Sequence, residues 1–138
     1  LVDSGVEQGA DLVVDGRDYS LQGYENGFFM GGCLFDKVTP DMDIYRQEIF
    51  GPVLSVMTFR TPEEALRRAN NTPYGLAAGV WSDKGSRIFE VASKLKAGVV
   101  WCNSYNRFDA SSPFGGYKES GFGREGGRQG LRAYVNLV

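Results

Sequence analysis

The second part of the chain alternates short apolar segments with amphipathic ones, and this rhythm constrains the fold more than any other feature. Apolar segments of strand length cover residues 53–59, 76–81 and 99–102, and segments of helical character cover 61–70 and 82–96 between them. Strands that alternate with helices pair in parallel through right-handed crossovers, because each helix has to return the chain across the sheet. The sequence therefore predicts an α/β fold with a partial parallel sheet and crossover helices.

Both crossover helices carry signals for where they begin. The first opens with a capping box, in which Thr61 and Glu64 surround Pro62 at the first helical position. We expect Ser82 and Asp83 to cap the second helix. Its apolar residues recur with helical spacing, at Ile88, Val91, Ala92 and Leu95.

The first part of the chain predicts a less regular region. Residues 1–10 have the pattern of the last turns of a helix that ends at Gly9, and residues 11–15 form a short apolar strand. A polar excursion with several glycines follows, and residues 28–38 are expected to form a second, bent strand. Because the chain opens on Leu1 within a helical pattern, we expect it to be a fragment of a longer protein.

Composition is that of an ordinary folded protein and excludes several functions. The 138 residues suffice for one domain-sized core, with 42% hydrophobic residues and a net charge of −2. Nothing in this balance attracts nucleic acid, and no apolar stretch is long enough to span a membrane. A basic cluster of Arg124, Arg128 and Arg132 is diluted by neighbouring glutamates, so we interpret it as a solvated helix face.

Histidine is absent and there are two cysteines, which limits the chemistry of the chain. It offers no imidazole for acid–base catalysis, and Cys33 and Cys102 cannot make a zinc site alone, so we expect no metal. Two distant cysteines without a secretory signal indicate reduced thiols in the cytoplasm. Apolar surroundings favour a buried structural thiol for Cys33 over a nucleophile. The glycine-rich residues 121–127 lack the strand–loop–helix context of a phosphate loop.

The run Glu48-Ile49-Phe50-Gly51-Pro52 combines a carboxylate, an aromatic ring and a rigid turn. A carboxylate at a strand mouth can accept two hydrogen bonds from a ribose diol, and a neighbouring ring offers a flat face to a heteroaromatic cofactor. The alternative is a surface Glu48 and a buried Phe50 at an ordinary strand entry. These residues alone leave both interpretations open.

Three further blocks follow this run, at Tyr74–Trp81, Ser112–Lys118 and Ser120–Glu125. In this order and at about this spacing, the four blocks resemble the C-terminal part of the NAD(P)-dependent aldehyde dehydrogenases. The resemblance implies that residues 1–130 are the C-terminal portion of the catalytic domain and residues 131–138 an oligomerisation strand. It also implies that the nucleophilic cysteine and the general-base glutamate lie upstream of this chain, so we assign no catalytic residue to it.

The same resemblance implies roles for four side chains. Glu48 would hydrogen-bond the nicotinamide ribose of NAD or NADP, and Phe50 would pack beside the nicotinamide ring. Phe108 and Phe114, on the loop 105–114, would wall the channel through which the aldehyde substrate enters. The alternative is that these two phenylalanines anchor the loop as core aromatics.

The two halves resemble different branches of the family. Residues 3–6, 15–17, 23–27 and 31–36 look most like methylmalonate-semialdehyde dehydrogenases, the acylating branch that uses coenzyme A. Residues 103–125 look like the hydrolytic branch that includes betaine-aldehyde and general aldehyde dehydrogenases. Because the substrate-facing loop lies in this second half, we favour oxidation to a carboxylic acid and keep the coenzyme A-dependent reaction as the alternative.

Two points concern association with other chains. By the resemblance, residues 134–138 match a strand that joins a neighbouring subunit in a homo-oligomer, with a plain edge strand as the alternative. The resemblance also places Cys102 at a non-catalytic core position. A competing hypothesis is an inactive association module, since a parallel sheet without its upstream partners has unpaired edges. A third is a small nucleotide-binding protein that uses Glu48 alone. We expect the chain by itself neither to reduce nor measurably to bind NAD.

Overall fold

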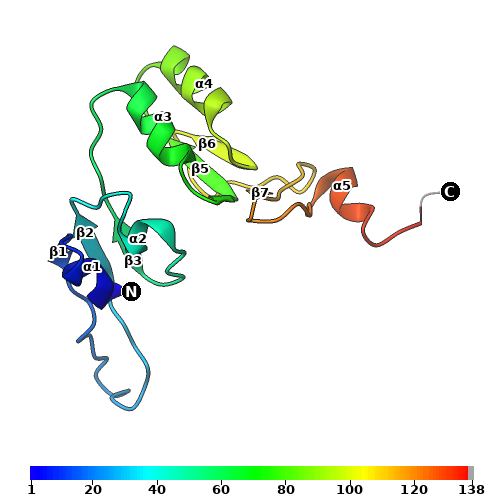
Figure 1. Ribbon diagram of the computed structural model, residues 1–138. Helices are drawn as coiled ribbons and strands as arrows, with labels where there is room; N and C mark the ends of the chain where they lie inside the picture. Colours follow the sequence, from blue (N-terminus) through cyan, green and yellow to red (C-terminus); the bar gives the residue numbers. More distant parts are fainter. Residues whose placement is uncertain (137–138) are drawn as a thin grey trace. The chain divides into compact units, whose positions relative to one another are not determined.

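The helices and strands of this chain form three small sheets and fall into two compact units. The computed structural model describes residues 1–136, and the two units are Leu1–Phe59 and Arg60–Val138 (Figure 1). The expected single parallel sheet is wrong, because strand β3 (Val53–Ser55) pairs in parallel with the strand that precedes it, β2 (Cys33–Asp36). Alternation of strands and helices indicates parallel pairing, but it does not specify which neighbour a strand takes. The mixed α/β character is confirmed.

In the first unit, a three-stranded sheet is covered by two short helices. Its elements are α1 (Val2–Glu7), β1 (Asp11–Val14), β2, α2 (Asp43–Arg46) and β3. Strand β1 runs antiparallel to β2 with an irregularity in register between Leu12 and Val14, and Cys33 lies opposite Val53 in the parallel pair. The helix expected at the start of the chain and the strand after it are both confirmed, whereas α2 had no signal in the sequence.

The core of the first unit is built around Phe35, which is fully buried. The other buried members of this cluster are Ala10, Val38, Met42 and Ile44. Helix α1 approaches the cluster closely at Gly5, where an added Cβ would lie 3.0 Å from the Phe35 and Ile44 side chains. The helix ends as predicted at Gly9, whose φ of +92° is readily adopted only by glycine.

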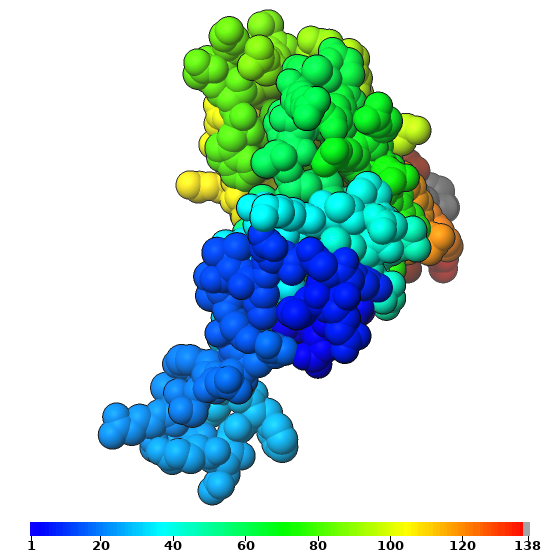
Figure 2. All heavy atoms as spheres, turned by 60° about the vertical axis from the view of Figure 1, so that its left-hand side comes forward, coloured from blue at the N-terminus to red at the C-terminus, as the bar shows by residue number. Residues whose placement is uncertain are grey.

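The glycine-bearing excursion is longer than the sequence predicts, because only Cys33–Asp36 of the expected strand 28–38 pairs. Figure 2 shows the excursion projecting from the rest of the first unit. Its neck is closed by two glycines: the Gly31 N–H donates to the Gly16 carbonyl at 2.8 Å, and a Cβ on Gly16 would lie 2.3 Å from the Gly31 backbone. The missing side chains that permit this approach also leave nothing to pack into a longer strand.

The second unit contains two small sheets and three helices within its described residues. Its elements are α3 (Pro62–Asn70), β4 (Tyr74–Gly75), β5 (Ala77–Val80), α4 (Gly85–Lys94), β6 (Val99–Cys102), β7 (Tyr117–Lys118) and α5 (Gly127–Leu131). Strands β5 and β6 pair in parallel, with Ala77 opposite Val99, and α4 connects them. This is the strand–helix–strand crossover that the sequence predicts. Strands β4 and β7 form a separate antiparallel pair.

The helix starts follow the sequence signals in one case and depart from them in the other. At α3 the Thr61 hydroxyl accepts from the Glu64 N–H at 3.2 Å, as predicted, although the Glu64 carboxylate accepts from the Arg60 N–H rather than from Thr61. The expected cap of α4 is wrong. The Ser82 hydroxyl instead accepts from the Lys84 N–H at 3.2 Å, which closes a turn before the helix. Serine competes in this way because its hydroxyl bonds equally well to a nearby turn.

The end of the chain differs from the predicted pattern. Residues 134 and 135 form a turn and a bend, and residues 137 and 138 lie outside the described part, so the oligomerisation strand and the boundary at residue 131 stay predictions. Arg124 precedes α5, and its guanidinium donates to the carbonyls of Gly116 at 2.9 Å and Gly123 at 2.7 Å. The interpretation of this arginine as part of a solvated helix face is therefore wrong.

Candidate functional site

Glu48 and Phe50 lie on the loop between α2 and β3, and both side chains are exposed. Phe50 is 93% exposed and has a φ of +56°, a left-handed conformation that bulky residues rarely adopt. Ile49 between them packs against the Phe35 cluster. The loop therefore anchors itself through Ile49 and presents its two neighbours to solvent.

This geometry bears on the two interpretations of the loop. The structural alternative involves a buried Phe50, whereas the ring is exposed in this chain. Within residues 1–136, the Glu48 carboxylate has no hydrogen-bond or ion-pair partner, so its acceptor capacity is open to a ligand.

An open apolar groove lies beside this loop. Its volume is about 500 Å³, and it is lined by Val14, residues 32–34 and residues 51–54. Glycines at positions 32 and 51 leave the lining free of large side chains there. The groove offers hydrophobic surface and carries few polar groups, so by itself it provides contact area rather than chemistry.

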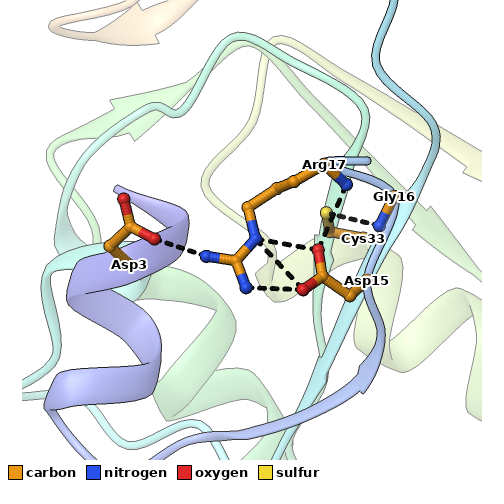
Figure 3. A network of polar contacts seen from close by, with 5 residues as sticks. All are labelled: Asp3, Asp15, Gly16, Arg17 and Cys33. Atoms are coloured by element: carbon orange, nitrogen blue, oxygen red, sulfur yellow. Dashed lines mark hydrogen bonds and ion pairs between the residues drawn. The ribbon is translucent and has the colours of Figure 1, made fainter. Parts of the chain in front are cut away.

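The thiol of Cys33 is buried at the base of the excursion, as predicted, and Figure 3 shows its polar neighbours. Its Sγ accepts from the Gly16 N–H at 3.4 Å. Asp15 and Arg17 flank Gly16, and the Arg17 guanidinium donates two hydrogen bonds to the Asp15 carboxylate, Nε to Oδ1 at 2.8 Å and Nη2 to Oδ2 at 2.5 Å. A third guanidinium nitrogen donates to Asp3 on α1. These contacts tie the excursion to the first helix and leave Cys33 a structural thiol.

The Arg17 network also shifts the titration of its members. The hydrogen bond from the Arg17 side chain, followed by that from its backbone N–H, lowers the pKa of Asp15 to about 2. The same contact raises the pKa of Arg17. In the part of the chain that the structure describes, no group of three or more acidic or cysteine side chains could hold a metal ion.

Cys102 is exposed, so the expected core position is wrong. Side chains alternate between the two faces of a strand, and its neighbour Trp101 takes the buried face of β6. Because β6 belongs to a two-stranded sheet, the opposite face has little to cover it.

The two phenylalanines predicted to face the substrate are in contact with each other. The rings of Phe108 and Phe114 meet edge to face, with centroids 5.0 Å apart and planes at 88°. Phe108 is 58% exposed and Phe114 is half-buried. Each ring thus packs on one side and offers surface on another, which is compatible with both anchoring the loop and walling a channel.

The loop that carries these rings is fixed by a residue that the sequence did not single out. The indole N–H of Trp101 donates to the Arg107 carbonyl at 2.8 Å, and the indole ring meets Phe108 at 5.4 Å and Tyr105 at 5.2 Å. Nothing in the strand pattern around Trp101 marks this role, because the partners lie on the following irregular segment. A buried tryptophan needs an acceptor for its N–H, and that requirement is the only signal available beforehand.

The far end of the loop is pinned by backbone hydrogen bonds. Phe114 and Glu125 exchange two N–H···O bonds of 2.7 Å, and the Gly127 N–H donates to the Ala110 carbonyl at 2.9 Å. Just before Ala110, Asp109 closes a turn by accepting a hydrogen bond from the Ser111 hydroxyl, and this bond is the main cause that lowers the pKa of Asp109.

Comparison with known proteins identifies the family of the chain. A model described as the aldehyde dehydrogenase family matches residues 1–138. The chain belongs to the aldehyde dehydrogenase family.

Individual members of the family match over almost the whole chain. A betaine aldehyde dehydrogenase of Brucella anthropi is 45% identical, covering 99% of this chain and 28% of its own length. Aldehyde dehydrogenase, cytosolic 1, of Rattus norvegicus is 45% identical, covering 99% and 26%. The crystal structure of a Sinorhizobium meliloti protein, provisionally assigned as a methylmalonate-semialdehyde dehydrogenase and complexed with NAD, is 48% identical with a TM-score of 0.90, covering 98% of this chain and 28% of that one.

The chain therefore spans just over a quarter of the length of these aldehyde dehydrogenases. Solved structures of several homologues contain NAD. Relatives with betaine-aldehyde and methylmalonate-semialdehyde names both match across nearly all of its residues, rather than one in each half. Among the described residues, no helix has the length and apolar character needed to cross a membrane.

Proposed function

We propose that this chain is part of an enzyme that oxidises an aldehyde to a carboxylic acid with NAD or NADP. Glu48 holds the nicotinamide ribose, Phe50 lies beside the nicotinamide ring, and Phe108 and Phe114 wall the aldehyde channel. The nucleophilic cysteine and the general base belong to another part of the longer protein. The observation that carries the proposal is that one anchored loop holds an exposed Phe50 ring and a Glu48 carboxylate without a partner among the described residues.

The backbone of this loop supports a ligand contact over a packing role. A bulky residue in the left-handed region costs about 1–3 kcal/mol and persists where the surroundings impose it. Phe50 accepts this conformation without burying its ring, so its own packing does not repay the strain. A ring held out from the surface suits contact with a flat cofactor.

The residues of this chain act by positioning. The cofactor, when bound, accepts the hydride of the substrate. Glu48 would fix the ribose through two hydrogen bonds and so set the direction of the nicotinamide, since both ribose hydroxyls can donate to one carboxylate. Phe108 and Phe114 would hold the carbon chain of the aldehyde and exclude water from it. Water is our preferred acyl acceptor, with coenzyme A as the alternative.

Further features of the complete protein follow from its relatives. We propose a cytoplasmic enzyme, because one relative is named as cytosolic, and a homo-oligomer formed through residues 134–138. The name of that relative and the resemblance of the tail support these two statements.

The test is Glu48→Gln in the longer enzyme that contains this chain. Glutamine keeps the shape but loses the charge, and a hydrogen bond to a charged group contributes about 1.5–3 kcal/mol. We expect kcat/KM to fall by about tenfold or more, with weaker NAD binding. Glu7→Gln, at an exposed glutamate on α1, is the matched control. Unchanged kinetics in Glu48→Gln would defeat the assignment.

A second candidate is an inactive association module. Several large apolar side chains are almost fully exposed, including Phe28 at 106% and Phe122 at 97%, and surface of this kind favours self-association. Light scattering of the 138-residue chain tests this possibility. On the same sample, calorimetric titration with NAD should show no measurable heat of binding, and an aldehyde-dependent assay should show no reduction of NAD. Reduction by the chain alone would show that our placement of the nucleophile outside it is wrong.

A further inference from the structure

We propose that Trp101 is a positioning residue for the aldehyde channel, which sets the angle and place of Phe108 and, through it, of Phe114. The inference rests on the proposed function, because it concerns the wall of the same channel. Trp101 itself is only 7% exposed and lies on the buried face of β6, so it acts through the two phenylalanines and not by touching the substrate.

The indole makes three contacts with one short segment. Its Nε1–H donates to the Arg107 carbonyl at 2.8 Å. Its ring meets Tyr105 with centroids 5.2 Å apart and planes at 63°, and Phe108 at 5.4 Å and 88°. One rigid side chain on a strand thereby fixes the backbone at position 107 and the rings on either side of it.

The chain of ring contacts continues from Phe108 to Phe114. The two rings meet at 88° with centroids 5.0 Å apart, so the orientation of Phe108 limits that of Phe114. Edge-to-face pairs are favoured because the positive edge of one ring meets the negative face of the next. Trp101 is the buried member of this series, and Phe108 is well exposed. The buried Trp101 therefore restrains Phe108, and Phe108 restrains Phe114, on the surface that would meet the substrate.

The other contacts that hold this loop lie at its two ends and do not involve residues 104–108. At its start, the Asn103 amide exchanges hydrogen bonds with the Ser82 backbone at 2.9 and 3.0 Å. At its end, Phe114 pairs with Glu125. Across residues 1–136, the hydrogen bonds and ring contacts of residues 104–108 all involve Trp101, apart from the contact between Phe108 and Phe114.

The role requires tryptophan specifically. Phenylalanine would keep an aromatic ring on β6 but could not donate to the Arg107 carbonyl, and the smaller ring would reach Phe108 less closely. The segment would then be held by weaker contacts, and Phe108 would sample more orientations. An aldehyde with a long apolar chain depends on that wall, whereas a two-carbon aldehyde barely reaches it.

The first arm of the test is backbone ¹⁵N NMR relaxation on the 138-residue chain. In Trp101→Phe, we expect the order parameters of residues 105–108 to fall from the range of rigid backbone, about 0.85, to below about 0.6. Trp81→Phe is the matched control, because Trp81 is the other tryptophan, lies in the same unit and is 61% exposed. Equal order parameters in the two variants would overturn the proposal.

The second arm measures steady-state kinetics in the longer enzyme with acetaldehyde and hexanal. Trp101→Phe should raise KM for hexanal about fivefold relative to acetaldehyde and leave kcat for acetaldehyde within about twofold. A merely structural defect would change both substrates alike, and that result would overturn the positioning role. If the unsubstituted enzyme oxidises neither aldehyde, the proposed function fails, and the relaxation arm still decides whether Trp101 orders the loop.

A second variant covers the case in which Trp101→Phe does not fold. Tyr105→Leu removes an exposed ring from the indole without changing the core. It should lower the order parameters of residues 106–108 and raise the hexanal-to-acetaldehyde KM ratio about twofold. No change in either quantity would count against the inference.

Discussion

Gly98 offers a sharp test of how the second unit is assembled. It lies just before β6, where its N–H donates to the Gly75 carbonyl at 3.0 Å. A Cβ added to Gly98 would lie 1.6 Å from the carbonyl oxygen of Gly115 and 2.7 Å from its carbonyl carbon. We therefore expect Gly98→Ala to destabilise the second unit and to displace the segment that carries Phe114.

The size of the effect follows from what surrounds the new methyl group. To restore ordinary van der Waals contact, the Gly115 backbone would have to move by about 2 Å. Overpacking a well-packed site costs about 1–3 kcal/mol. Because the atoms in the way are backbone and cannot rotate aside, we expect the upper end of that range, about 3 kcal/mol.

Urea denaturation followed by tryptophan fluorescence measures this loss, since Trp81 and Trp101 both lie in the second unit and the chain has no other tryptophan. The matched control is Gly85→Ala at the first position of α4, where a Cβ would meet nothing within 4 Å. This variant should unfold at the same urea concentration or slightly higher, because alanine favours helix. An unchanged midpoint for Gly98→Ala would refute the close approach of residues 98 and 115.

Two further predictions concern the first unit and the thiols. The Arg17 guanidinium holds the pKa of Asp15 at about 2 against an ordinary 3.8. A carboxylate whose pKa is lowered in the folded state stabilises the fold above its unfolded pKa and loses that contribution as the pH falls towards 2. Between pH 5 and pH 2, the free energy of unfolding of Asp15→Asn should therefore fall less than that of the unsubstituted chain. Urea titration followed by circular dichroism measures the difference. A thiol reagent should label exposed Cys102 within the time that leaves buried Cys33 unmodified, and equal labelling of both cysteines by mass spectrometry would contradict their burial.

Signals that act over a few residues were predicted correctly from the sequence. The capping hydroxyl of Thr61, the glycine end of α1 at Gly9 and the parallel strands on either side of α4 all depend on neighbours close in the chain. The four motif blocks likewise identified the family, because each is a contiguous run of residues. The residues around Glu48 left its role open until that resemblance was added, and the roles of Glu48 and Phe108 stay predictions.

Features that depend on distant residues could not be obtained in this way. The pairing of β3 with β2, the exposure of Cys102 and the contact of Trp101 with Arg107 were wrongly predicted or absent from the sequence analysis, and the exposure of Phe50 was left open.

Local hydrogen bonds and side-chain periodicity determine where a helix begins and which residues alternate along a strand. The sequence alone therefore decided the starting helix, the helix that Thr61 caps, the strands on either side of α4 and the family of this protein. The burial of a side chain and the choice of a strand's partner depend on residues that are distant in the sequence. The tertiary structure alone therefore decided that Phe50 faces solvent, and it alone brought a strand tryptophan against the loop of Phe108.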